Sequence, residues 1–475
     1  MAKTAGVRTK TFEDLNNDFY SAFDNPEIFN CLEFNLIKVA QEGIKVQYTF
    51  KSYFGRPWWI FNGIRNLKKS SASKVDIGKL VNWQKHLSTL AKRPYLVFDN
   101  GTYVENKSGV HKPVFSENII QSLGREQVVY IRELPRGSKG DVGYDIDMEE
   151  VLNLIHCIPV GKEEKELYQS LLNTHQTIKE NSSFSGEELY AIKMSFFGFW
   201  QIFVVANFVM KQLQPKKAFF NCHYHKEGII MALKRKGIFT TEFQHGLIDR
   251  NDFFYFYPEK VEAVMPKALF ADEFLAYGKY WRDLLLEGVE YTEDQLKIGG
   301  FYLYQEKGVS EELKQELERR KGSNGKIILI SLQTNLYAVF NDYITWLSED
   351  MTSKGQEGII LVKPHPIMKP ETYSPVVDLP NVLVTRESIH GLFSVSDLHI
   401  SIYSTTLYEA LASALPNFAL YVESCRDYIS TILDNGVATK LPFDQNPLEM
   451  LEKGSTNVDS KYFFEVFQPE NILSS

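Results

Sequence analysis

Strand-like and helix-like segments alternate regularly from about residue 214 onward, and this alternation constrains the fold more than any other feature of the chain. "KKAFFNC" has the pattern of a buried strand, "KEGIIMALKRKG" has helical periodicity and ends at Gly237, and "IFTTEFQHG" is the next strand with its exit. "ALFADEFLAYGKYWRDLLLEG" and "LKIGGFY" continue the pattern. Strands that alternate with helices form a parallel, doubly wound sheet, so the segment predicts an α/β domain.

Residues 303–326, "LYQEKGVSEELKQELERRKGSNGK", are charged, have helical periodicity and end in Gly-Ser-Asn-Gly. Alternation then resumes with the strand candidates "IILISLQT", "GIILVKPHP", "NVLVTR", "DLHISIY" and "NFALYV". We therefore expect an α/β chain with two Rossmann-like, doubly wound domains that face a cleft. The expected division is an N-terminal domain at 1–305, a linker at 306–326, a C-terminal domain at 327–455 and a segment at 456–475 that packs back across the junction.

The composition is that of a soluble globular protein. The chain has 475 residues, of which 44% are hydrophobic and 24% charged, and its net charge is −8. A negative net charge argues against a broad basic surface for nucleic acid. The cysteines Cys31, Cys157, Cys222 and Cys425 have no paired spacing. They predict neither a disulfide framework nor a zinc site, and they fit the reducing cytoplasm.

Two segments raise the question of membrane contact. Met194–Met210 is uncharged but contains Ser195, Gln201 and Asn207, so we expect a buried helix rather than a membrane anchor. Residues 47–69 alternate aromatic and basic side chains. That pattern fits a helix that packs its aromatic side chains inward, and also a segment that lies on a lipid surface. The N-terminus has no apolar stretch of the signal-peptide kind. We expect a cytoplasmic protein, with peripheral contact to the inner face of the membrane through residues 47–69 as the alternative.

The strand exits carry most of the candidate site residues, because ligands of open parallel sheets bind at the carboxyl ends of the strands. In "TEFQHGLIDRND", His245 follows a strand directly and precedes Gly246, which allows a sharp turn. Asp249 and Asp252 follow within reach. Histidine suits general-base catalysis on a hydroxyl group, although a histidine at a turn can also serve only the local backbone.

A second exit, "ILVKPHPIMK", ends a buried strand with Lys363 and His365, each followed by a proline. The prolines fix φ on either side of the imidazole and hold it outside the sheet. A rigid histidine beside a lysine suits the binding of an anion. A proline-rich strand terminator is the simpler alternative.

A third exit, "ISIYSTTLYEALASALPNFAL", places Ser404, Thr405 and Thr406 at the start of a helix. Hydroxyl groups and free N–H groups at a helix start form an anion site. Glu409 lies about one turn further on, where it could reach sugar hydroxyls. Thr406 and Glu409 also have the spacing of a capping box, which needs no ligand.

These motifs, in this order, resemble the donor half of GT-B-fold glycosyltransferases. The similarity is to bacterial capsule and lipopolysaccharide enzymes, including the sialyltransferase and Kdo-transferase types, and covers residues 215–425 by pattern. "FQHG" is similar to the His-Gly motif of capsule transferases and of teichoic-acid glycerophosphotransferases. The chain departs from the pattern at Ala414, where many such enzymes carry Gly. It also lacks the Asp/Glu-Asp/Glu-Gly motif of several bacterial sialyltransferases, which argues against a sialic-acid donor.

The resemblance implies an inverting, metal-independent glycosyltransferase. Its co-substrate would be a nucleotide sugar, CMP- or UDP-linked, and its acceptor a cell-surface polysaccharide or a lipid-linked glycan. In such enzymes a Lys-x-His-Pro motif and a Ser/Thr-rich helix start hold the nucleotide phosphate, and an acidic residue often binds the ribose. Lys363, His365, Ser404–Thr406 and Glu409 match these motifs.

On the acceptor side, we expect His245 to take the proton of the acceptor hydroxyl, with Asp249 as the reserve base. Three alternatives stay open: a polyol-phosphate transferase of the CDP-glycerol type, a nucleotide-sugar 2-epimerase, and a non-catalytic GT-B-like partner subunit of a polysaccharide synthase. The epimerase would need more carboxylates around the sugar than the sequence offers.

Two motifs suggest a metal at first sight. Asp145 and Asp147 form an Asp-x-Asp sequence, but they precede an apparent helix start, where acidic residues are favourable without a ligand. His223 and His225 have no further ligands clustered around them in the sequence. We expect no catalytic metal.

Overall fold

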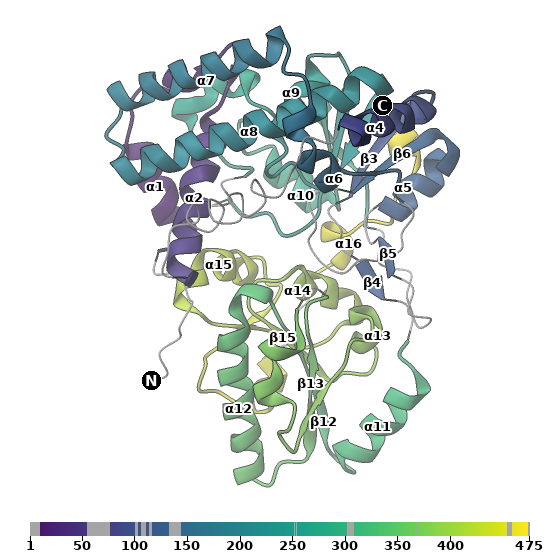
Figure 1. Cartoon of the computed structure of the whole chain (residues 1–475). Helices are drawn as coiled ribbons and strands as arrows, with labels where there is room; N and C mark the ends of the chain where they lie inside the picture. Colours follow the sequence, from purple (N-terminus) through teal and green to yellow (C-terminus); the bar gives the residue numbers. More distant parts are fainter. Residues whose placement is uncertain are drawn as a thin grey trace.

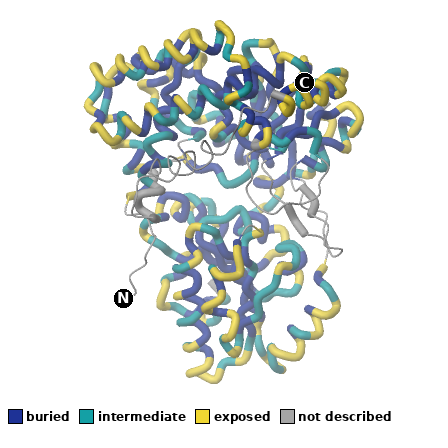
Figure 2. The backbone as a smooth tube through the Cα atoms, viewed as in Figure 1, coloured by how far each residue is buried: buried dark blue, intermediate teal, exposed yellow. Residues whose placement is uncertain are grey.

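Two separate parallel sheets form the framework of the chain, one in each lobe (Figure 1). The structure is a computed structural model. It describes residues 10–54, 77–99, 103–105, 111–113, 116–132, 144–250, 252, 254–301, 308–366, 368–453 and 458–473. Each lobe has buried residues along its centre and exposed residues mainly on its outer helices (Figure 2).

The first sheet has seven strands, in the order β11-β10-β9-β8-β3-β6-β7, and all of its neighbours pair in parallel. The strands are β3 (Tyr95–Asp99), β6 (Val128–Arg132), β7 (Ile146–Asp147), β8 (Lys217–Phe220), β9 (Phe239–Phe243), β10 (Glu273–Ala276) and β11 (Leu296–Ile298). Two small antiparallel pairs accompany it: β1 (Asn30–Cys31) with β2 (Phe34–Asn35), and β4 (Tyr103–Glu105) with β5 (His111–Pro113).

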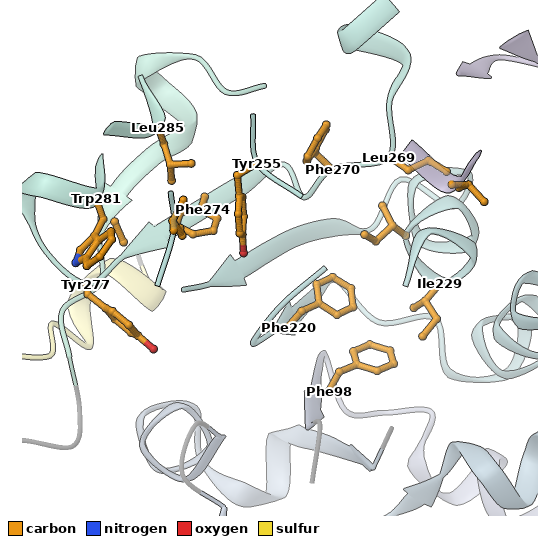
Figure 3. Packing of buried hydrophobic residues seen from close by; sticks show 14 of the residues in the cluster. Phe98, Phe220, Ile229, Tyr255, Leu269, Phe270, Phe274, Tyr277, Trp281 and Leu285 are labelled. Atoms are coloured by element: carbon orange, nitrogen blue, oxygen red, sulfur yellow. The ribbon is translucent and has the colours of Figure 1, made fainter. Parts of the chain in front are cut away.

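Helices cover both faces of this sheet. The helices of this lobe are α1 (Phe12–Ser21), α2 (Ile37–Phe54), α4 (Ile77–Leu90), α5 (Ser116–Leu123), α6 (Met148–Asn153), α7 (Lys162–Glu180), α8 (Gly186–Leu213), α9 (Glu227–Lys234) and α10 (Lys279–Leu285), and α7 packs on α8. On one face the strand side chains Phe98 and Phe220 stack at 4.9 Å and pack toward Ile229 of α9 (Figure 3). On the other face, α5 supplies Ile119 and Ile120 to a second apolar cluster.

Helix α8 is the helix predicted around Met194–Met210. By length and composition it is long and apolar enough to cross a membrane. In the structure it packs along α2, α7 and α9, and its residues from 203 to 210 are buried. The side-chain amide of Asn207 donates to Glu164 of α7 at 2.6 Å. The C-terminal part of the helix therefore lies in the core of the first lobe, where Asn207 has its polar partner, whereas Tyr190 and Phe197 in its N-terminal part are exposed.

The second sheet has six parallel strands in the order β14-β13-β12-β15-β16-β17. Its strands are β12 (Lys326–Ser331), β13 (Gly358–Lys363), β14 (Val382–Val384), β15 (Leu398–Ser401), β16 (Asn417–Leu420) and β17 (Thr439–Leu441). The remaining helices are α11 (Glu311–Lys321), α12 (Tyr337–Ser353), α13 (Ile389–Phe393), α14 (Thr405–Glu409), α15 (Arg426–Asp434), α16 (Ser460–Phe463) and α17 (Glu470–Leu473).

Alternate side chains of β12 explain how this sheet is covered. Ile328 and Ile330 face the cluster that contains Phe340 of α12, and Ile327 faces the cluster that contains Leu317 of α11. Because successive strand residues point to opposite faces, an unbroken apolar strand must be covered on both sides. Helix α11 lies within the segment predicted as a linker, and it packs on the second sheet.

Both sheets have the doubly wound strand order. In each, the first strand along the chain lies between the second and the fourth: β3 lies between β6 and β8, and β12 lies between β13 and β15. The chain therefore leaves the first strand toward one edge of the sheet and later returns to build the other half. This arrangement confirms the predicted fold class, two Rossmann-like α/β domains of the GT-B kind.

The C-terminal segment crosses from the second sheet back to the first domain. The carbonyl of Phe463 accepts a 2.9 Å hydrogen bond from the indole of Trp281 in α10. Phe301 pairs with this segment through its N–H, which donates to Glu465 at 2.8 Å. Tyr408 of α14 packs between, with ring centroids 5.1 Å from Trp281 and 4.9 Å from Phe463. Aromatic side chains thus join the cores of the two domains.

Candidate functional site

The carboxyl ends of the two sheets are turned toward each other, and side chains from both domains join there. Thr431 of α15 donates its hydroxyl hydrogen to Asp249, in the loop after β9. Asn435, at the end of α15, donates to the hydroxyl of Tyr280 in α10 at 2.6 Å. Helices α14 and α15 follow strands of the second sheet, whereas the Asp249 loop and α10 follow strands of the first (Figure 1). Because ligands of such sheets bind at the carboxyl ends of strands, this junction is the candidate site.

His245 lies at the exit of β9, and its ring packs edge-on against Tyr224, with 4.8 Å between the ring centroids. Its neighbour Gln244 is fully buried. The side-chain oxygen of Gln244 accepts from the N–H of Tyr277 at 2.9 Å, and its Nε2 donates to the carbonyl of Gly246 at 2.9 Å. The first bond fixes the turn against the exit of β10, and the second closes the turn itself. The backbone that carries His245 is therefore held in place from inside the first domain.

Two buried carboxyl groups follow His245 in the same loop. Asp249 has no exposed surface and accepts the hydrogen bond from Thr431. Asp252 accepts from the N–H of Phe254 at 3.0 Å. Burial raises the pKa of Asp252 to about 7, and the charge of Asp249 acts in the same direction. A carboxyl group with a pKa near 7 can take up and release a proton at physiological pH.

Lys363 and His365 lie where β13 ends, and a third basic residue joins them. The ammonium group of Lys363 donates to the carbonyl of Arg386 at 3.3 Å. The guanidinium of Arg386, two residues beyond the end of β14, donates to the carbonyl of Met368 at 2.9 Å and to the hydroxyl of Tyr373 at 3.0 Å. The exits of two neighbouring strands thus bring three basic side chains together.

Burial and a neighbouring positive charge lower the pKa of Lys363 and the pKa of His365. The pKa of Lys363 falls to about 8, mainly through burial and then through the charge of Arg386, while Glu387 opposes the shift. The pKa of His365 falls to about 4 through burial and then through the charge of Lys363. Within the described residues, no carboxylate forms an ion pair with Lys363. An anion bound here would favour the charged forms, so the arrangement suits an anion.

Ser404, Thr405 and Thr406 form the start of α14, at the exit of β15. Ser404 is the N-cap, and its hydroxyl oxygen accepts from the N–H of Thr406 at 3.3 Å. The helix has only five residues, so its dipole is short. The hydroxyl of Thr406 lies 2.9 Å from that of Ser331, the last residue of β12. This contact spans the boundary between β12 and β15, where the strand order reverses and ligands of such folds bind.

Glu409, the last residue of α14, is buried. Its Oε2 lies 2.8 Å from Nε2 of His390 in α13. The capping box with Thr406 is not formed, since Ser404 is the N-cap and its own hydroxyl binds the N–H of Thr406. Glu409 is thus placed against α13, and a ribose that approached it would compete with His390.

The Asp-x-Asp motif is held by arginines. Asp145 accepts from Arg93 at 2.9 Å and from Arg125 at 2.8 Å. Asp147 lies 3.3 Å from Arg132 in the neighbouring strand. Three cations neutralise the two carboxylates at the edge of the first sheet, and this gives the motif a structural role.

The two histidines of "NCHYH" are turned to different partners. His223 lies 2.7 Å from Glu242 through Nδ1 and 3.0 Å from the carbonyl of Phe254 through Nε2. His225 lies 3.1 Å from Glu42. In the part of the chain that the structure describes, no group of three or more His, Cys, Asp or Glu side chains is placed to hold a metal ion.

The aromatic and basic segment at residues 47–69 begins in α2, which ends at Phe54. Residues 55–69 lie outside the described part of the chain. Contact of this segment with a lipid surface stays a prediction.

Four residues at the junction were not selected as site residues from the sequence: Gln244, Asp252, Ser331 and Arg386. Ser331 and Arg386 lie at or just beyond the ends of β12 and β14, so the rule that pointed to the other strand exits applies to them as well. Gln244 directly precedes His245, and Asp252 follows in the same loop, within the reach expected from the sequence. Only the hydrogen bonds and the burial show what they do.

No protein-family model and no curated protein matches the chain. Solved structures to which the chain is similar include UDP-GlcNAc 2-epimerase from Neisseria meningitidis bound to UDP-GlcNAc, at 14% identity and a TM-score of 0.45, covering 80% of this chain and 98% of that one. The S. aureus MnaA–UDP co-structure has 10% identity and a TM-score of 0.49, with coverages of 80% and 95%. MurG from Acinetobacter baumannii has 12% identity and a TM-score of 0.39, with coverages of 80% and 98%. At these values the likeness identifies no activity, and the fold assignment rests on the two sheets themselves.

Proposed function

We propose that the chain is an inverting, metal-independent glycosyltransferase that moves a sugar from a nucleotide sugar to a cell-surface polysaccharide or a lipid-linked glycan. One observation carries the proposal: a histidine held at the carboxyl edge of one sheet and a cluster of basic side chains at the carboxyl edge of the other both lie at strand exits of the two domains that join there. The first group can activate a nucleophile, and the second can stabilise a leaving group.

On the donor side, Lys363 and His365 bind the nucleotide phosphate, with Arg386 behind them. In the unliganded protein Lys363 is largely charged at pH 7, because its pKa is about 8. His365 is neutral there, because its pKa is about 4, and it donates a neutral hydrogen bond. Negative charge grows on the phosphate as the bond to the sugar breaks. Donors that are already fixed in place stabilise that charge without reorganisation.

On the acceptor side, His245 takes the proton of the attacking hydroxyl. Gln244 holds the backbone of the turn from both sides, and Tyr224 packs against the ring. Such fixed placement is what a general base needs in order to meet the acceptor at hydrogen-bond distance. Asp249 and Asp252 are both buried; Asp249 accepts the hydrogen bond from Thr431, and Asp252 has a pKa of about 7, so we propose Asp252 as the alternative reserve base.

The test is nucleotide release from a panel of UDP-GlcNAc, UDP-glucose, GDP-mannose, a CMP-linked sugar and CDP-glycerol, with and without a bacterial membrane extract as acceptor. Release of a nucleotide from one sugar donor, dependent on the extract and unaffected by EDTA, supports the proposal. Release of CMP from CDP-glycerol alone would instead identify a polyol-phosphate transferase. Isomerisation of the sugar without release would identify an epimerase. Binding without any turnover would identify a non-catalytic partner subunit.

A further inference from the structure

A chain of side-chain hydrogen bonds runs across three neighbouring strands beneath α14. Asn417 of β16 lies 2.8 Å from Nδ1 of His399 in β15. Nε2 of His399 lies 2.8 Å from the hydroxyl of Ser331, and that hydroxyl lies 2.9 Å from the hydroxyl of Thr406. Asn417 and His399 are fully buried, Ser331 is buried, and Thr406 is half-buried. The chain therefore leads from the core to the candidate site.

The donor and the acceptor of each hydrogen bond can be assigned by starting from Asn417, at the buried end of the chain. The side-chain NH₂ of Asn417 donates to the carbonyls of Leu407 and Val437, at 2.6 and 2.9 Å. Carbonyls only accept, so the amide cannot be turned the other way, and its oxygen faces His399. Nδ1 of His399 must then carry a hydrogen and donate it. Burial lowers the pKa of His399 to about 4, so the ring is neutral at pH 7 and its Nε2 is an acceptor.

The outer end follows in the same way. Ser331 donates its single hydroxyl hydrogen to Nε2 of His399. Its oxygen can then only accept from Thr406. The hydrogen of the Thr406 hydroxyl is thereby committed inward, and only lone pairs remain on the side that faces the junction.

We infer that Asn417, His399 and Ser331 order the hydroxyl of Thr406 as an acceptor, so that Thr406 binds a hydrogen-bond donor of the nucleoside, a ribose hydroxyl or a base N–H, and not a phosphate oxygen. This rests on the proposed binding of a nucleotide sugar at this site. It revises the part of the phosphate-binding prediction that concerns Thr406 and leaves the phosphate to Lys363 and His365. The nucleoside then lies over the exit of β15 and the phosphate over the exit of β13.

The order of the hydrogen bonds can be tested without any ligand. In protein labelled with ¹⁵N-histidine, His399 is assigned by comparison with His399→Gln, and its ring nitrogens report the tautomer. We expect a protonated Nδ1 and an unprotonated Nε2 at every pH from 6 to 9. A protonated Nε2 in that range would reverse the chain of donors and overturn the inference.

The role of Thr406 is tested by affinity. The probes are UDP, CMP, GDP, their 2′- and 3′-deoxy counterparts, and inorganic pyrophosphate. Thr406→Val, which keeps the shape but removes the hydroxyl, should weaken the bound nucleotide about tenfold and leave pyrophosphate within about twofold. Ser413→Ala, at an exposed position of the same segment, is the matched control and should change neither. A deoxy compound that binds equally to wild type and Thr406→Val identifies the ribose hydroxyl that Thr406 accepts. If all deoxy compounds lose affinity in the variant, the base is its partner.

Equal losses for nucleotide and pyrophosphate in Thr406→Val would show phosphate binding and would contradict the inference. Asn417→Asp provides a second check: the negative charge of the carboxylate should favour the protonated form of His399, whose Nε2 then donates to Ser331, so that Ser331 donates to Thr406 and the Thr406 hydrogen is free to turn toward the ligand. Nucleotide affinity should then fall as in Thr406→Val, while pyrophosphate affinity should not. If no nucleotide binds the wild-type protein, the proposed function is wrong, and so is the proposal that Thr406 accepts a hydrogen bond from the nucleoside. The ¹⁵N spectrum still decides the order of the hydrogen bonds.

Discussion

The hydroxyl of Thr431 donates a hydrogen bond to the buried carboxylate of Asp249 and so joins the second domain to the first. Both residues lie in segments that follow the carboxyl ends of strands. The bond therefore holds the two edges of the candidate site against each other.

Thr431→Val should lower the free energy of unfolding by about 1–3 kcal/mol, because a hydrogen bond to a buried charged group is lost while the shape is kept. Urea denaturation measures the change. Ser430→Ala, at an exposed position on the same helix, is the control and should be neutral. Equal stability of Thr431→Val and wild type would show that the domain contact does not depend on this bond.

His245→Gln should abolish turnover and leave the affinity for nucleotide nearly unchanged, because the proposed base acts on the acceptor and not on the donor. His156→Gln, at an exposed position outside the candidate site, serves as the matched control. Nucleotide release and equilibrium binding are measured on the same preparations. Parallel loss of binding and turnover would remove His245 from the role of base.

Lys363 should make nucleotide affinity depend on pH. Its pKa in the unliganded protein is about 8, well below the ordinary value of a lysine, mainly because of burial. Below pH 8 the ammonium group is already charged when a phosphate binds. Above pH 8 it must first take up a proton, so the dissociation constant should rise by up to about tenfold per pH unit there.

Calorimetric titrations between pH 6 and 10 measure this dependence, and proton uptake above pH 8 is an independent sign of it. Lys363→Met should bind more weakly and lose the dependence, whereas Lys369→Met, exposed in the same loop, should retain it. A dissociation constant in wild type that stays flat up to pH 10 would contradict the placement of the phosphate beside Lys363.

Ala414→Gly should stabilise the protein. Ala414 has φ +51° and ψ +31°, in the left-handed region that disfavours a side chain, and it is exposed. Glycine removes this strain, for an expected gain of about 1 kcal/mol. Ala412→Gly, two residues earlier and also exposed, lies within a helical turn and should lower stability by about 0.5–1 kcal/mol. If the two substitutions changed the free energy of unfolding equally in urea denaturation, the strain assigned to the left-handed conformation of Ala414 would be contradicted.

Most of the fold could be predicted where apolar strands and helices alternate without interruption. Every strand expected between residues 214 and 420 is present, because apolar runs such as Ile327–Ile330 must be buried on both faces. The strand β6 was not predicted, although Val128–Ile131 is an equally apolar run. It lies between segments of irregular composition, and its place beside β3 depends on distant pairing that no local pattern reveals.

The site could be predicted only in part, because local patterns show where strands end but not which distant side chains bond to one another. Strand exits can be read from the sequence, so Lys363, His365 and Thr406 were selected, and the structure brings their exits to one edge of the sheet. The direction of the Thr406 hydroxyl depends on Asn417, which lies in another strand and is fixed by two backbone carbonyls. The direction of a hydrogen bond that is set by residues in other strands cannot be predicted from the local sequence.

The central claim is that a nucleotide binds with its phosphate at Lys363 and His365. The most direct test is a thermal-shift panel of CMP, UDP, GDP, CDP and TDP on wild type, His365→Ala and the exposed control His156→Ala. Stabilisation of wild type and of the control by one nucleotide, and its loss in His365→Ala, is the predicted result. Stabilisation of His365→Ala to the same extent as wild type, or no shift of wild type with any of the five, would contradict the claim.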